Sequence, residues 1–170
     1  VAVGWNRDLT IGKDVHELTI PWDMVRQESL DSGSYVVVLR LPRDRRISVG
    51  GLGGIKFRKG FYLYVGSAKK NLTQRINRHR SERKKLFWHI DYLRQHAEFH
   101  VALPIRTSAN LECGIAASLK EIADWQVDAF GSSDCSCETH LFGMKDDPLH
   151  SPQFIKRILR LCKFYQLHFI

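Results

Sequence analysis

Several features are scarce or missing in this chain of 170 residues, and each absence excludes a class of protein. No apolar run approaches the ~20 residues that a membrane-spanning helix needs, so we expect no membrane partner. No charged start leads into an apolar signal segment, and four cysteines are too few and too unevenly spaced to suggest a disulfide framework. We therefore expect a cytoplasmic protein. Internal repeats and low-complexity tracts are also absent from the sequence.

Acidic residues are scarce in one segment. Residues 33–95 hold 16 Lys and Arg but only 3 Asp and Glu, whereas the whole chain has a net charge of +8. Such a local surplus attracts phosphate backbones, although a solvated helix face can carry one too. We favour a nucleic acid as the partner, DNA before RNA. The predicted backbone contacts are Lys69, Lys70, Arg78, Arg80, Lys84 and Lys85.

Apolar and β-branched runs, together with helical spacing, indicate an α+β fold with a small, mainly antiparallel sheet flanked by helices. The predicted strands cover residues 35–41, 47–49, 55–58, 61–65 and 99–103, the last ending at Pro104. The predicted helices cover residues 71–81, 85–97, a segment capped by Ser108, and 149–170, where residues 166–170 could instead form a strand. The first four strands are expected to form a meander. Gly50–Gly54 lacks the Lys-Ser/Thr ending of a phosphate-binding loop, so it is interpreted as a hairpin connector, with close approach to a phosphate as the alternative.

Charge and pattern divide the chain into three parts. Residues 1–32 are acidic and form a predicted N-terminal linker or extension, with a weak strand and a short helix opened by Pro21. Residues 33–145 form the main domain. Residues 146–170 form a predicted C-terminal helical extension that packs on it.

Two three-residue motifs suggest catalytic chemistry. The first motif is Gly33-Ser34-Tyr35, and the second motif is Tyr64-Val65-Gly66. After the second motif in the sequence, Arg75 and His79 are one helical turn apart. Glu112 lies at the edge of the apolar stripe of a later predicted helix. A phenol can relay a proton, a guanidinium can clamp a phosphate, and a carboxylate can hold a divalent ion. Either tyrosine alone would more often be structural, and Arg75 and Glu112 could instead lie on solvated helix surfaces.

The arrangement resembles the GIY-YIG nuclease superfamily, and within it the Uri-type branch of small prokaryotic proteins. The resemblance covers about residues 33–142 and is also carried by Lys85–Leu93, Leu111-Glu112-Cys113 and Gly131–Phe142. It implies a GIY-YIG-type domain in which Tyr35 and Tyr64 assist the attacking water, Arg75 clamps the phosphate and Glu112 holds the metal. His79 matches a position that is often polar, with a base or supporting role.

This chain departs from the family pattern at two points. Ser34 stands where Ile is typical, and Tyr35 and Tyr64 are 29 positions apart, although such an insertion is usual in the Uri-type branch. The first residues are slightly similar to the end of a sugar fermentation stimulation protein domain. The resemblance also implies that a fused or partner domain can supply specificity.

Two further sets of residues have both a functional and a structural interpretation. His89 could support the site, whereas Asp91 is expected to satisfy backbone or arginine donors. Cys135, Cys137 and His140, with Cys113 beside Glu112, could form a Cys₃His zinc site, or they could be reduced thiols packed in a loop. Ser132, Ser133 or Asp134 could supply a polar group to the site.

The sequence therefore predicts an endonuclease that uses Mg²⁺ or Mn²⁺ to hydrolyse DNA. No second carboxylate is placed in sequence to pair with Glu112, so one metal is favoured over two. The alternatives are a nucleic-acid-binding module without cleavage and a nuclease that acts on RNA.

Overall fold

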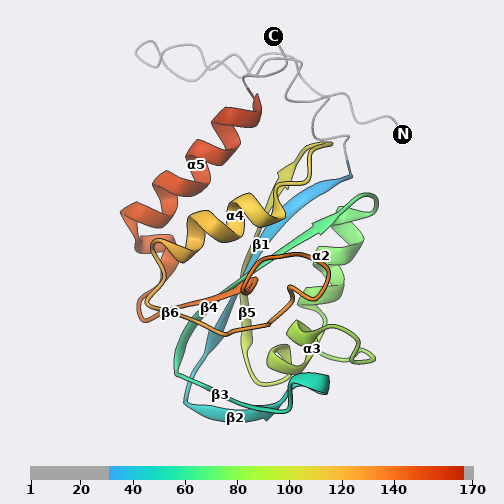
Figure 1. The fold of residues 1–170 in the computed structure, drawn as a ribbon, viewed down its shortest axis with the longest axis vertical. Helices are drawn as coiled ribbons and strands as arrows, with labels where there is room; N and C mark the ends of the chain where they lie inside the picture. Colours follow the sequence, from blue (N-terminus) through green and yellow to red (C-terminus); the bar gives the residue numbers. More distant parts are fainter. Residues whose placement is uncertain (1–30, 167–170) are drawn as a thin grey trace, which may run out of the picture.

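An antiparallel sheet of five strands forms the middle layer of the molecule, with helices on both faces (Figure 1). The computed structural model describes residues 31–166, with side chains as far as residue 161. The strands, in spatial order, are β5 (Glu98–Arg106), β1 (Gly33–Leu41), β4 (Gly60–Ala68), β7 (Leu141–Met144) and β6 (Trp125–Gln126). The predicted α+β class is confirmed. The elements predicted within residues 1–30, and a final strand over 167–170, lie outside the described residues.

Strand β1 is apolar from Tyr35 to Leu39 because both of its faces are covered there. Tyr35, Val37 and Leu39 belong to one buried cluster, whereas Val36 and Val38 belong to the other. The first face is covered by α2 (Leu72–Arg80) and α3 (His89–Arg94), and the second by α4 (Glu112–Lys120) and α5 (Pro152–Gln166). The core positions predicted on α2, Leu72 and Ile76, are buried against the first face.

The insertion between the two motifs lies outside the main sheet. β2 (Arg45–Ser48) and β3 (Gly54–Phe57) pair only with each other among the described strands, through the short 3₁₀ turn η1 (Gly50–Leu52). The glycine-rich segment is therefore a hairpin connector, as predicted. The predicted meander is wrong, because β1 pairs directly with β4 across the insertion and sets Tyr35 opposite Gly66.

Three predicted boundaries are wrong. The helix predicted over 85–97 begins only at His89, because the Asp91 carboxylate accepts the backbone N–H groups of Phe87 and Trp88 before the first turn. Ser108 does not cap the next helix, which begins at Glu112. Strand β5 continues through Pro104, which an edge strand tolerates because no second neighbour needs its missing N–H.

The C-terminal part completes the second face. Helix α5 begins later than predicted, after the 3₁₀ turn η2 (Pro148–His150), and places Phe154 in the core beside α4. An ion pair of 2.6 Å joins Arg157 of α5 to Glu121 at the end of α4. Strands β6 and β7 were not predicted. In the described part of the chain, no helix is both long enough and apolar enough to cross a bilayer.

Candidate functional site: a cleft at the end of the β1–β4 pair

A cleft of about 390 Å³ opens where β1 begins and β4 ends. Strand β7 pairs with β4 only as far as Tyr64, so Gly66 and Ser67 lie beyond it and line the cleft. The fold brings six predicted residues to the lining: Tyr35, Arg75, His89, Glu112, Ser133 and Asp134. Tyr64 and His79 are not part of the lining. They pack behind it, with their ring centroids 5.8 Å apart.

The Tyr35 side chain lies across Gly66, which explains why the second motif ends in glycine. A Cβ at Gly66 would come within 2.4 Å of the Tyr35 hydroxyl oxygen. The Tyr35 hydroxyl and His79 Nε2 share a hydrogen bond of 2.8 Å. Tyr35 is only 2 % exposed, yet it reaches the cleft. The pair therefore links the cleft to a buried imidazole.

Burial sets the protonation states of this pair. It lowers the pKa of His79 to about 3, helped by the nearby Lys84 charge, so the imidazole is neutral at physiological pH. Burial also raises the pKa of Tyr35, and of Tyr64, above the ordinary phenol value. A neutral His79 can accept a proton from Tyr35 along their hydrogen bond. Its Nδ1 atom is buried without a hydrogen-bond partner among the described residues.

Arg75 is held in place before any ligand arrives. Its Nη1 donates to the Ser67 carbonyl oxygen at 3.0 Å, and its guanidinium lies 4.9 Å from the centre of the Trp88 ring. Arg78 is stacked on the same indole at 4.3 Å. A planar guanidinium fixed in this way at the lining of the cleft suits the binding of a phosphate.

Glu112 is the first residue of α4 and points back toward the end of β4. Ser67 Oγ donates to Glu112 Oε2 at 2.5 Å, and Glu112 Oε1 lies 3.2 Å from His140 Nδ1. Burial acts to raise the pKa of Glu112, but His140 and Ser67 outweigh it and hold the pKa below its ordinary value. The carboxylate is thus ionised at neutral pH.

Ser34, the residue of the first motif that departs from the family pattern, has a structural role that was not predicted from the sequence. Its buried side-chain oxygen accepts the Leu111 N–H at 3.2 Å. Leu111 is the residue before Glu112, so this bond fixes the start of α4 at the cleft. Ile would offer no acceptor there. A serine inside an apolar strand was the available signal.

The loop before β7 brings Ser133 and Asp134 to the cleft, two of the three residues predicted to supply a polar group there, whereas Ser132 is not part of the lining. Asp134 is also a second carboxylate in the lining, for which no pairing position with Glu112 was identified in sequence. Phe87 lies within the helix predicted over 85–97 but precedes the observed helix, and its side chain is 75 % exposed at the cleft. His89 accepts the Gly131 N–H through Nδ1 at 3.1 Å and so supports that loop.

The predicted backbone-contact residues fall into two groups. Lys69, Lys70, Arg80 and Lys85 are exposed. Arg78 and Lys84 instead form ion pairs with the buried carboxylate of Asp91, at 2.9 and 3.0 Å. The predicted role of Asp91 is confirmed, and any contact of Arg78 or Lys84 with a nucleic acid stays a prediction.

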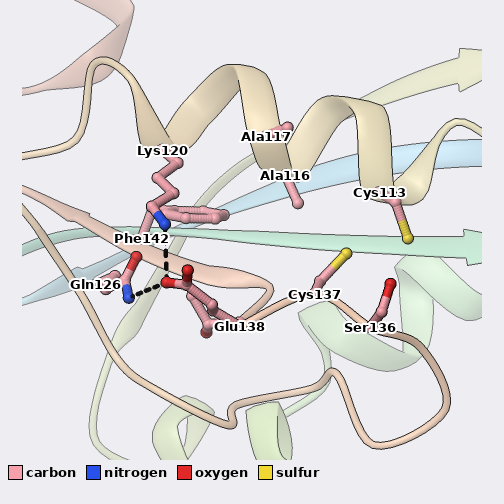
Figure 2. A pocket seen from close by; sticks show the side chains of 10 residues that line it. Cys113, Ala116, Ala117, Lys120, Gln126, Ser136, Cys137, Glu138 and Phe142 are labelled. Carbon is pink, nitrogen blue, oxygen red and sulfur yellow. Dashed lines mark hydrogen bonds and ion pairs between the residues drawn. The ribbon is translucent and has the colours of Figure 1, made fainter.

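The fold also gathers the predicted cysteine and histidine cluster. The ligand atoms of Cys113, Cys135, Cys137 and His140 all lie within 4.8 Å of one another, so the cluster could hold a metal ion. Figure 2 shows Cys113 on α4 with its sulfur directed toward that of Cys137 on the opposite loop, beside a pocket of about 220 Å³. Within that pocket, Glu138 accepts hydrogen bonds from Lys120 and Gln126.

Comparisons with known proteins identify a family without a stated activity. No curated protein and no solved structure matches the chain. A family profile matches residues 34–162, which include the cleft and the Cys/His cluster. This chain therefore belongs to the family described as Domain of unknown function DUF123.

Proposed function

We propose that this protein is a divalent-metal-dependent endonuclease of the GIY-YIG type that hydrolyses DNA phosphodiester bonds. One observation carries the proposal: a hydrogen-bonded Tyr35–His79 pair, a preoriented Arg75 and an ionised Glu112 meet at a single cleft. Exposed lysines at positions 69, 70 and 85 belong to the basic segment that supplies this cleft. A protein that only bound nucleic acid would need the lysines but not the Tyr–His pair.

Arg75 and Tyr35 have separate tasks in this reaction. The Arg75 fork binds the scissile phosphate and stabilises the charge that grows on its oxygens. Water attacks the phosphorus atom, its proton passes to the Tyr35 oxygen, and the Tyr35 proton passes to His79 Nε2. The P–O bond to the leaving group then breaks, and the leaving oxygen takes up a proton from solvent. His79 is neutral before the reaction, but a pKa of about 3 makes it a weak base, so this step requires the negative charge of the bound phosphate to raise that pKa.

The residues around Glu112 fit Mg²⁺ or Mn²⁺. The donors that reach this part of the cleft are the carboxylates of Glu112 and Asp134 and the hydroxyls of Ser67 and Ser133, all of them oxygen ligands. The side chain of Glu112 is 20 % exposed, which leaves the carboxylate accessible from the cleft. A bound ion would neutralise phosphate charge there.

The proposal is tested with supercoiled, linear and branched DNA, and with RNA of the same sequence, in Mg²⁺, Mn²⁺ or EDTA. We expect metal-dependent nicking that falls by about 100-fold or more in Glu112→Gln and at least about 10-fold in Arg75→Lys. Glu121→Gln on the same helix and Arg83→Lys on the basic surface are the matched controls, and both should cleave like the wild type.

Each other outcome has a definite meaning. Salt-sensitive binding without cleavage of any substrate would refute the nuclease and favour a binding module. Cleavage of RNA alone would keep the mechanism and change the substrate. Full activity in Glu112→Gln would remove that carboxylate from the site.

A further inference from the structure

The Cys/His cluster lies outside the proposed reaction but has the dimensions of a coordination sphere. Cys135 Sγ and His140 Nε2 are 3.4 Å apart. A tetrahedral zinc ion separates a sulfur and a nitrogen ligand by about 3.5 Å, and two sulfurs by about 3.8 Å. Since all four ligand atoms lie within 4.8 Å of one another, a sulfur–sulfur pair needs to close by about 1 Å at most, and a sulfur–nitrogen pair by about 1.3 Å at most, to match those zinc spacings.

The exposure of the thiols argues against a simple packing role. Cys113 is exposed, and Cys135 and Cys137 are partly exposed, so none of them fills the apolar core. All three are free thiols. Reduced cysteines that served only to pack a loop would be buried among apolar side chains, whereas these converge on one point at the surface.

A second, independent observation concerns the imidazole. His140 is 1 % exposed and is contacted on both ring nitrogens: Nε2 faces Cys135, and Nδ1 lies 3.2 Å from Glu112 Oε1. Nδ1 lies at ion-pair distance but has no aligned hydrogen bond among the described residues. Metal-binding histidines commonly orient their second nitrogen toward a carboxylate in this way.

We propose that Cys113, Cys135, Cys137 and His140 bind one Zn²⁺ ion, with Glu112 as the carboxylate partner of His140. Three thiolates and one imidazole in a tetrahedral arrangement select zinc over Mg²⁺, Ca²⁺ or Mn²⁺. Coordination through Nε2 fixes the proton on Nδ1, which then donates to Glu112. The ion fastens the first turn of α4 to the loop before β7.

The position of that loop gives the ion a structural purpose. Residues 127–140 connect β6 to β7 without helix or strand, and they carry Gly131, Ser133 and Asp134 into the cleft. A metal clip can hold such a segment where a small core cannot. Zinc would thus position the cleft from outside without touching a substrate, and its binding does not depend on the nuclease proposal.

The site is tested by metal analysis of the full chain, purified under reducing conditions and reconstituted with Zn²⁺. We expect about one zinc per chain in the wild type and in Cys162→Ser, but less than about 0.2 in Cys135→Ser and in Cys137→Ser. Substitution by Co²⁺ should give visible bands of tetrahedral thiolate coordination, lost in the same variants. Substoichiometric zinc in the reduced wild type, or bands unchanged in both variants, would overturn the proposal.

A wild-type experiment covers the case in which the variants do not fold. Zinc should slow alkylation of Cys113, Cys135 and Cys137, measured by peptide mass, relative to the metal-free protein. Equal rates with and without zinc, or a disulfide between two of these residues in the reduced protein, would contradict the site.

The role of Glu112 has its own measurement. Competition with a chromophoric chelator should show about 10- to 100-fold weaker zinc binding in Glu112→Ala. Glu138→Ala, which removes an exposed carboxylate next to Cys137, is the control and should bind zinc like the wild type. Unchanged affinity in Glu112→Ala would refute the partnership. Zinc binding without nucleic-acid cleavage would leave this site standing while the nuclease proposal fails.

Discussion

Asp91 holds together the wall of the cleft that carries Phe87 and Trp88, and replacing it should destabilise the protein in a pH-dependent way. Its carboxylate is completely buried and accepts hydrogen bonds from Arg78 and from the backbone N–H groups of Phe87 and Trp88. Lys84 adds an ion pair at 3.0 Å. Asp91→Asn removes the charge while keeping the size of the side chain, so it isolates the electrostatic contribution.

The magnitude follows from the titration of this carboxyl group. Burial acts to raise its pKa, but Arg78, Lys84 and the two N–H donors together lower the pKa from 3.8 to about 2. Because the pKa is lower in the folded state, the stabilisation is present above pH 3.8 and is lost as the pH falls through 2. It amounts to about 2 kcal/mol at pH 7, about half of that at pH 3 and only a small remainder at pH 2.

Urea unfolding followed by tryptophan fluorescence measures the effect. Asp91→Asn should lower the free energy of unfolding by about 2–3 kcal/mol at pH 7, and by roughly half as much at pH 3. Glu82→Gln is the matched control, since its side chain is 75 % exposed in an ion pair with Arg94, and it should change stability by less than about 0.5 kcal/mol. A loss below about 1 kcal/mol at pH 7, or an equal loss at both pH values, would refute the reasoning.

Two further predictions concern the cleft. In Gly66→Ala, the new methyl group would meet the Tyr35 hydroxyl, so we expect cleavage to fall at least about 10-fold while DNA affinity in a gel-shift assay changes little; unimpaired cleavage would show that Tyr35 does not act from this position. In Phe87→Ala, stability should change by less than about 0.5 kcal/mol because the ring is exposed, whereas affinity for single-stranded DNA should drop about 5- to 100-fold through lost stacking on a base. Unchanged affinity in fluorescence anisotropy would exclude that contact.

The features that local pattern encodes were predictable. The β-branched runs predict β1 and β4, and the spacing of Leu72 and Ile76 predicts the buried face of α2, because each signal depends on neighbours within one or two turns. Strands of two and four residues, such as β6 and β7, carry no such period. The late start of α3 depends on Asp91 and its distant cationic partners, which no local signal shows.

In the candidate site too, some residues could be predicted from local sequence pattern and others depend on tertiary contacts. The two glycine–tyrosine motifs, and the helix that follows them, suggested Tyr35 and Arg75 as site residues. The fold brings both residues to one cleft. Asp134 was one of three neighbouring candidates, and the loop conformation decides that it and Ser133, but not Ser132, line the cleft. Phe87 reaches the cleft because the helix begins only at His89, which the apolar pattern did not indicate. Cys135, Cys137 and His140 are close in sequence, but Cys113 joins them only because α4 begins beside the loop before β7.

Both outer strands of the five-stranded sheet are poor templates for a strand from another molecule. β5 contains Pro104, which has no N–H to offer, and its register against β1 shifts between Val38 and Leu39. At the opposite edge, β6 is only two residues long. Long, regular edge strands favour edge-to-edge aggregation. The proline and register shift in β5 and the short length of β6 both disfavour such pairing. Strand addition is therefore disfavoured at both edges, and we expect a protein partner of this domain to recognise its side chains instead.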